Sequence, residues 1–166
     1  MENFHANSSR SDRPVLPGIR RDPGCRVECE LGAVGIRVDR CFGTTVEGNY
    51  IEDFGNAAGT KTAYGLQATL QGDAASVISG NKVFDFNADS KATRYIYIGV
   101  TAVNYGVGEL AIVGNSVRGN SRTSDTGLSY SVGNGQGMTL ISEANVVLDV
   151  GTPRTVGQGV TISKGY

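Results

Sequence analysis

Acidic residues at the ends of short apolar stretches are the best catalytic candidates in this chain. Asp53 and Asp85 end the runs "IED" and "VFD", and Asp149 occupies the equivalent place further along. Two carboxylates about 5 to 9.5 Å apart can hydrolyse a glycosidic bond. Aspartate is equally common where strands end in turns, so a structural role explains the same residues. We keep Asp53 and Asp85 as weak catalytic candidates.

A second group of side chains is suited to binding. Arg94, Tyr95, Tyr97 and Tyr105 lie in the stretch "RYIYIGVTAVNY". Tyrosine rings offer apolar faces on which sugars can stack, and tyrosine and arginine are also enriched in subunit interfaces. If Ile96 faces a core, alternation places Tyr95 and Tyr97 outside. The stretch predicts a glycan-binding stripe, a subunit interface or an ordinary exposed surface.

The cysteines and the single histidine give no clear site. Cys25, Cys29 and Cys41 are an odd number for a closed disulfide framework, and the "CRVEC" spacing matches no common zinc finger. Because His5 is the only histidine, a serine-histidine-aspartate triad is nearly excluded. We expect no metal and no cofactor. The thiols are either free or joined in a disulfide, within the chain through Cys41 or between chains.

A repeat along the chain indicates the elements that position these residues. Asparagines recur at intervals of 32, 34 and 30 residues, at Asn49, Asn81, Asn115 and Asn145. Apolar residues flank them at fixed distances, three before and two after: Val46, Ile78 and Ile112; Ile51, Val83, Val117 and Val147. The fourth copy departs from the pattern at Ser142 and at Ala144, where the others have glycine. We expect this copy to be distorted or to act as a cap.

A second strand precedes each asparagine turn. Apolar residues alternate with period two over 35–38, 65–68, 95–98 and 127–130, which is typical of a strand with one buried face. The tail at 159–162 is expected to start a fifth, incomplete copy. No segment shows a sustained helical period. Each unit is therefore predicted to be a strand, a variable loop, a strand, a tight turn and a strand.

Stacked coils explain the turns better than hairpins do. A Gly-Asn pair can close a hairpin, but the runs on each side are too short for a stable one. A sharp bend at a left-handed asparagine would keep both flanking apolar residues inside one cylinder. Coils about 4.8 Å apart would then pair equivalent strands. The four asparagines are predicted to form a ladder of side-chain amides.

The repeated pattern "V-x-G-N-x-I" resembles the right-handed parallel β-helix of the pectin-lyase-like superfamily, over roughly residues 33 to 150. In that superfamily an asparagine at the sharp turn stacks in a ladder. The resemblance implies an all-β, right-handed parallel β-helix of about four to five coils. It is most like the β-helices of bacteriophage tailspikes and fibres. Because the same fold also serves polysaccharide lyases and hydrolases, it does not select a function.

Composition narrows the classes of partner. The formal net charge is −1, so no global field favours nucleic acid. No apolar run approaches the roughly 18 residues that span a bilayer, so we expect no membrane insertion. The N-terminus "MENFHANSSRSDRPVLPG" lacks the apolar segment of a secretory signal. Residues 1–30 are polar and mixed in charge, and we predict an extended arm or linker there, followed by a β-helix domain over 31–166.

These expectations combine into one functional hypothesis. The chain is predicted to be a structural or adhesion protein of a virion, a β-helical spike, fibre or collar element, made in the host cytoplasm. It is expected to be a homotrimer that docks on other virion proteins through residues 1–30 and contacts host surface polysaccharide. The alternative is a carbohydrate-active β-helix enzyme, a hydrolase or lyase using Asp53 and Asp85, or a fragment of one. A glycan-binding module without chemistry is the third hypothesis.

Overall fold

The computed structural model describes most of the chain beyond residue 25. The described ranges are 26–28, 34–41, 43–52, 54, 61–72, 75–85, 92–105, 108–133 and 137–163, with side chains undescribed at 26–28, 41, 72 and 101–105. The strands are β1 (Arg26–Glu28), β2 (Val34–Cys41), β3 (Thr45–Glu47), β4 (Tyr50–Glu52), β5 (Thr62–Gly72), β6 (Ser76–Ser79), β7 (Lys82–Phe84), β8 (Ala92–Tyr105), β9 (Gly108–Val113), β10 (Ser116–Arg118), β11 (Thr126–Ser131), β12 (Met138–Glu143), β13 (Val146–Leu148), β14 (Thr152–Val156) and β15 (Val160–Ser163). Within these ranges every regular element is a strand.

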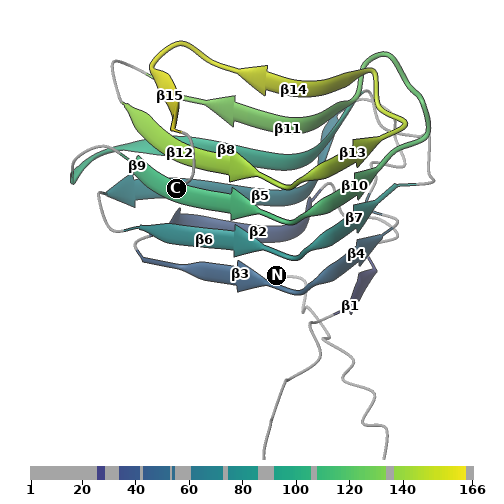
Figure 1. Ribbon diagram of the computed structural model, residues 1–166, viewed down its shortest axis with the longest axis horizontal. Coiled ribbons are helices and arrows are strands. Elements are labelled where there is room, and N and C mark those ends of the chain that lie inside the picture. Colours follow the sequence, from purple (N-terminus) through teal and green to yellow (C-terminus); the bar gives the residue numbers. More distant parts are fainter. Residues whose placement is uncertain are drawn as a thin grey trace, which may run out of the picture.

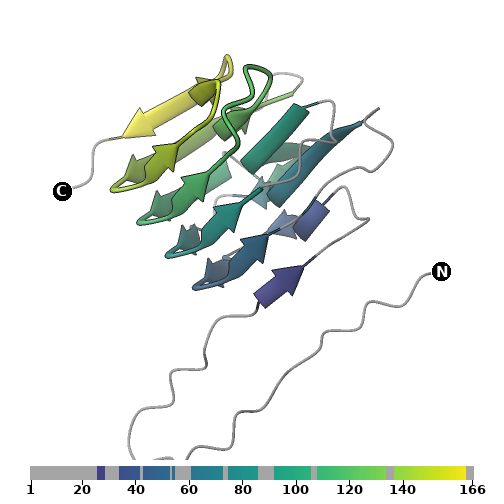
Figure 2. The ribbon, with the colours of Figure 1, turned by 90° about the vertical axis from the view of Figure 1, so that its right-hand side faces the viewer.

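The strands form three parallel sheets of five strands each (Figure 1). The first sheet has the order β1-β4-β7-β10-β13, the second β14-β11-β8-β5-β2 and the third β15-β12-β9-β6-β3. Each strand pairs in parallel with the strand three places on, as β4 does with β7. The chain therefore visits the second, third and first sheets in turn and climbs one strand per visit, which gives the stack of coils in Figure 2. The predicted all-β, parallel β-helical class is confirmed, and the hairpin alternative is excluded.

Like side chains stack on like inside the solenoid. In the third sheet, Val46 is in register with Ile78, and Ile78 with Ile112. In the first sheet, one register column holds Ile51, Val83, Val117 and Val147. Apart from Val147, which is partly buried, the residues of both columns belong to the buried core. Since each coil buries the same positions, the apolar repeat of the sequence is the core itself.

The turn between the third and first sheets bends at the residue before each asparagine. Gly48, Gly80 and Gly114 have φ of 68°, 63° and 66°, while Ala144 holds the same conformation at 51°. The asparagines are absent from the left-handed residues, so the expectation of a left-handed asparagine is wrong. Glycine takes the bend because it lacks the Cβ that makes positive φ costly. Asparagine is thereby left to form hydrogen bonds.

The four asparagines form a continuous ladder of amides. The Nδ2 groups of Asn49, Asn81 and Asn115 each donate to Oδ1 of the next asparagine, at 2.9, 3.0 and 2.9 Å. The backbone N–H of each also donates to that same oxygen, at 3.0 Å in all three steps. From the second coil on, Nδ2 donates as well to the preceding coil, as in the 3.0 Å bond from Asn81 to Val46 O. The ladder thus ties each of the four turns to its neighbours in the stack.

The two ends of the solenoid differ from the expected boundaries. Strand β1 lies inside the segment predicted to be an arm, and it pairs with β4 through the register Val27↔Ile51. The last coil begins at β14, which pairs with β11, whereas the predicted start at 159–162 is β15 of the third sheet. The stretch "TPRTV" shows no apolar alternation because β14 is largely exposed at the end of the stack.

Candidate binding face on the second sheet

A tyrosine pair with an arginine lies on the outer face of the second sheet. The rings of Tyr64 in β5 and Tyr97 in β8 meet edge to face, with centroids 5.4 Å apart and planes at 69°. The guanidinium carbon of Arg94 lies 5.5 Å from the centroid of the Tyr97 ring. All three side chains are half-buried, so each keeps an accessible surface. The group, named here the tyrosine platform, is Tyr64, Arg94 and Tyr97.

Strand alternation and a neighbouring glycine determine how the Tyr97 ring is oriented. The buried residues Ile96 and Ile98 point inward on either side of Tyr97, so its ring must project outward. Gly99 then leaves the surface open, because a Cβ there would lie 3.1 Å from Cε1 and Oη of Tyr97. The ring therefore leans along its own strand across Gly99. A larger residue at 99 would lift the ring from the sheet.

Hydrogen-bonding groups surround the platform on neighbouring strands. Gln67, Tyr97, Ser129 and Thr155 follow one another in register across the sheet. Arg94 Nη1 lies 3.5 Å from Ser129 Oγ, and Thr155 Oγ1 donates to Ser129 Oγ at 3.1 Å. Ser129 is buried and holds Arg94 and Thr155, whereas the Gln67 amide, the Thr155 hydroxyl and the Arg94 guanidinium keep accessible surface beside the rings. The arrangement can stack on the apolar face of a sugar ring while it bonds the hydroxyls around it.

The expectation that Tyr95 faces outward is wrong. Its exposed fraction is 0%, and its ring packs edge to face on Phe54 with centroids 5.8 Å apart. Alternation fails because the strand turns a corner where two successive residues face inward, Tyr95 and Ile96 here and Gly65 with Leu66 one coil below. A Cβ on Gly65 would lie 2.7 Å from Tyr95 O, which explains the glycine.

Asp85 belongs to an inner polar cluster that the sequence did not predict. Its carboxylate is fully buried and accepts a 3.1 Å hydrogen bond from Thr93 Oγ1. The backbone N–H of Thr93 donates to the buried carboxylate of Asp125 at 2.9 Å, and Arg122 Nε lies 3.9 Å from the same oxygen. The cluster fixes the corner between the first and second sheets. Because Asp85 is sealed inside it, its carboxylate does not reach a polysaccharide on the surface.

Tyr95 Oη lies beside this cluster. Burial raises the pKa of the Tyr95 phenol well above its usual value, and the charges of Asp85 and Asp125 raise it further. Arg122 and the nearby backbone N–H of Asn120 oppose that shift. Within the part of the chain that the structure describes, neither Tyr95 Oη nor Asp125 Oδ2 has a hydrogen-bond partner. The signal for the cluster in the sequence is weak, since Asp125 stands in an ordinary "TSDT" turn.

The other candidate residues are only partly described. Asp53, Cys25 and Cys29 lie outside the described residues, and Cys41 and Tyr105 are described by their backbone in β2 and β8 alone. Asp149 is exposed and pairs with Arg118 Nε at 3.0 Å, whereas Asp85 is fully buried. The structure therefore brings Arg94 and Tyr97 together with Tyr64, which the sequence did not single out.

The outer face of the third sheet carries an apolar stripe between three exposed glutamates, Glu47, Glu109 and Glu143. Val77, Ala111 and Ile141 follow one another in register, and Val113 lies in the column two residues on. Their neighbours Ile78, Ile112 and Leu140 are core residues, so alternation turns these four side chains outward. All four are half-buried small or branched residues. Such a surface is suited to packing against another solenoid.

Two classes of site are absent from the described ranges. There, no three histidine, cysteine, aspartate or glutamate side chains are placed to hold a metal ion. The same residues include no helix of the length and hydrophobicity needed to cross a bilayer. Comparison of the chain with models of protein families, with curated proteins and with solved structures gives no significant match.

Proposed function

We propose that this chain is a structural and adhesive β-solenoid of a virion, a spike, fibre or collar element that contacts host surface polysaccharide. In this proposal it is a β-helix of the pectin-lyase-like kind that acts as a homotrimer, and residues 1–30 attach it to other virion proteins. The observation that carries the adhesive role is the tyrosine platform, which is presented on a rigid sheet and surrounded by hydroxyl, amide and guanidinium groups.

The outer faces of the second and third sheets differ in composition, which favours a different role for each. The second sheet carries aromatic and hydrogen-bonding side chains at Tyr64, Arg94 and Tyr97, a combination that suits a sugar. The third sheet carries Val77 and Ile141 in an apolar stripe, a combination that suits a second solenoid. We therefore assign glycan contact to the second sheet and trimer packing to the third. The interface alternative for the tyrosines is weaker, because the third sheet offers the more apolar surface.

Glycan binding is tested by screening the chain against an array of bacterial surface polysaccharides. The account expects retention of at least one glycan, with Tyr97→Ala and Tyr64→Ala each weakening binding about tenfold or more. Tyr50→Ala is the matched control, because Tyr50 also contacts an aromatic ring, Phe84 at 5.5 Å, but on the first sheet. A chain that binds no glycan, or variants that all bind like the wild type, would contradict the adhesive role.

Trimer packing is tested by sedimentation of the full chain. The expected species contains three chains, and Ile141→Lys should dissociate it by placing a charge in the apolar stripe. Gln67→Lys places the same charge on the second sheet and should leave the trimer intact. A monomeric wild type rejects the trimer. If only Gln67→Lys dissociates the assembly, the second sheet is the interface and the assignment of roles to the two sheets is wrong.

A further inference from the structure

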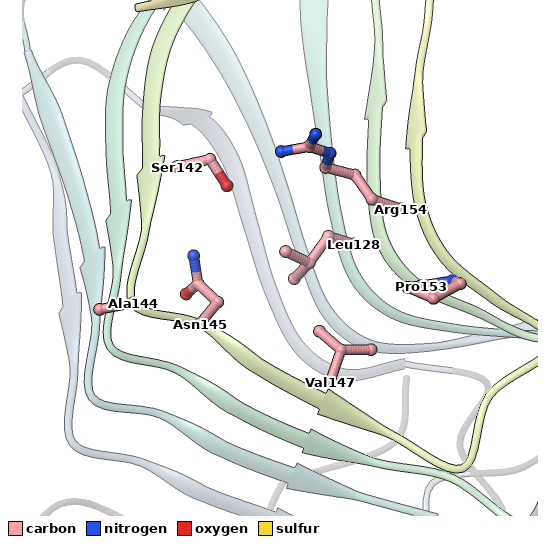
Figure 3. Close-up of a pocket in the computed structure, with 7 residues that line it drawn as sticks. All are labelled: Leu128, Ser142, Ala144, Asn145, Val147, Pro153 and Arg154. Atoms are coloured by element: carbon pink, nitrogen blue, oxygen red, sulfur yellow. The ribbon is translucent and has the colours of Figure 1, made fainter. Parts of the chain in front are cut away.

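A hollow opens at the end of the solenoid near the C-terminus. It has a volume of about 430 Å³, and its lining residues are Leu128, Ser142, Ala144, Asn145, Val147, Pro153 and Arg154. Figure 3 shows the polar ends of Ser142 and Arg154 directed into the space above Leu128 and Val147. The hollow is the interior of the last coil, so its walls repeat positions that are buried further down the stack.

The asparagine ladder ends at this hollow with unused donors. In each lower step, the N–H and Nδ2 of one asparagine donate to Oδ1 of the next. Asn145 accepts both bonds from Asn115 and sends Nδ2 to Ile112 O at 2.9 Å. Its own N–H has no acceptor among the described residues. The repeat therefore defines the place where an acceptor oxygen belongs, directly above Asn145.

Arg154 makes the same place electropositive. Leu128 and Arg154 are in register, so the guanidinium occupies a column that holds apolar residues in lower coils. Arg154 also acts on the Tyr130 hydroxyl, where its charge opposes the rise in pKa that burial causes. The described residues give Arg154 no ion pair or hydrogen bond. A carboxylate above Asn145 would meet a cation and an N–H donor together.

The edge of the first sheet beside the hollow is open. Val146 N donates to Asn115 O at 2.8 Å, so in a parallel strand the N–H and C=O of Val147 point to the other side. No described strand pairs with β13 there. Val146 and Leu148 are 50% and 53% exposed on the outer face of this sheet, at positions that hold the polar Ser116 and Arg118 one coil below. An extended segment could add to β13 through main-chain hydrogen bonds.

A second copy of this chain fits this end poorly. Continuing the register would set β1 of that copy on β13, with Cys25 at the position of the next ladder asparagine. It would also set the apolar Ile36 opposite Arg154, which buries an unpaired cation. Pro153 and Arg154 in β14 are residue types that discourage a further strand on the second sheet. The first-sheet edge at β13 is the one that borders the hollow.

We propose that the open edge of β13 docks an extended segment of a partner protein that carries an aspartate. The segment adds in parallel to the first sheet and places its carboxylate over Asn145, within reach of Arg154. Apolar residues after the aspartate cover Val146 and Leu148. The aspartate takes the place of the next asparagine of the ladder, and the cation favours it over an amide. This surface is separate from the tyrosine platform and does not depend on glycan binding.

The test uses a synthetic peptide of residues 141–149 carrying Asn145→Asp, because this segment docks in the same way one coil lower. The full chain is expected to bind it, and binding should slow hydrogen exchange at the Val147 amide. Arg154→Gln, or a peptide with Asn145→Leu instead, should weaken binding about tenfold or more. Lys82→Gln is the matched control, since Lys82 is an exposed cation two coils below, and it should bind like the wild type.

Three results would overturn the proposal. The first is no binding of the aspartate peptide by the full chain. The second is equal binding by Arg154→Gln and by the leucine peptide, which would indicate nonspecific edge pairing. The third is a Val147 amide that is already protected in the free chain, which would mean that other residues of the chain cover β13.

Discussion

The turns at Asn81 and Asn145 follow one pattern in opposite surroundings. Asn81 is fully buried and bonded to the asparagines above and below it, and its turn bends at a glycine. Asn145 has a neighbour on one side only, and its turn bends at Ala144 with a φ of 51°. The difference shows that the repeat sets the shape of both turns, whereas the burial and the hydrogen bonds of each asparagine depend on having a coil on each side.

The largest expected effect is the loss of a central ladder residue. Asn81→Ala removes an acceptor from Asn49 and a donor to Val46 O, and the surrounding coils keep water away. We expect the free energy of unfolding to fall by about 3 kcal/mol. Asn145→Ala should cost about 1 kcal/mol, because water at the open end can replace its bonds. Equal losses in urea denaturation of the two variants would remove the distinction between the turns.

At alkaline pH, the buried tyrosines Tyr95 and Tyr130 should lower the free energy of unfolding by different amounts. Burial raises the pKa of both Tyr95 and Tyr130, but the hydrogen bond to Ser142 and the charge of Arg154 oppose the shift at Tyr130. A phenol whose pKa is raised in the folded protein does not affect the free energy of unfolding below pH about 10, the pKa in the unfolded chain. Above that pH the phenol ionises only in the unfolded chain, and the free energy of unfolding falls. The loss is about 1.4 kcal/mol per pH unit for each tyrosine that ionises only on unfolding.

Urea denaturation between pH 9 and 11 measures this loss. Tyr95→Phe should flatten the decline more than Tyr130→Phe does, because the charges of Asp85 and Asp125 add to the pKa rise at Tyr95, whereas no such charge from the described residues acts on Tyr130. At neutral pH, Tyr95→Phe should be nearly neutral, since Oη has no partner among the described residues. A steeper decline in Tyr95→Phe than in the wild type would show that the phenol is not the group responsible.

The smallest effects come from exchanging the residues at the bend. Gly114→Ala meets no heavy atom within 4 Å, so its only cost is a left-handed alanine, about 1 kcal/mol of unfolding free energy. Ala144→Gly relieves the same strain in the last turn and should raise the free energy of unfolding by about 1 kcal/mol. Thermal unfolding of both variants provides the measurement. Changes of the same sign would show that Ala144 is not strained.

The coil architecture could be predicted because the asparagine turn and its flanking apolar residues recur several times in the sequence. The Gly-Asn pairs at 48–49, 80–81 and 114–115 each mark a turn, and the residues three before and two after each asparagine fill two core columns. Asparagine was assigned the left-handed bend because both residue types tolerate it, and only the backbone shows that Gly80 takes it. The prediction of an amide ladder is nevertheless confirmed, since the ladder depends on the asparagine side chains and not on which residue has the positive φ.

The candidate sites were harder to predict because they depend on corners between sheets. Simple alternation counted from Ile96 placed Tyr95 outside, whereas the strand bends between the two residues and buries both. A usable signal was present, since glycine occupies the position equivalent to Tyr95 in the other three strands, at Gly35, Gly65 and Gly127. Tyr64 was missed because its partner lies one coil away, and such a contact has no signature in a single repeat.

The most direct test of the adhesive role is an NMR titration of the chain with a polysaccharide fragment retained in the array screen. The account predicts shift changes concentrated at Tyr64, Arg94 and Tyr97 and on the neighbouring second-sheet residues Gln67 and Ser129. Resonances of β13 and of the third-sheet stripe should stay in place. Changes confined to the third sheet or to the end hollow, with the tyrosine platform unaffected, would contradict the account.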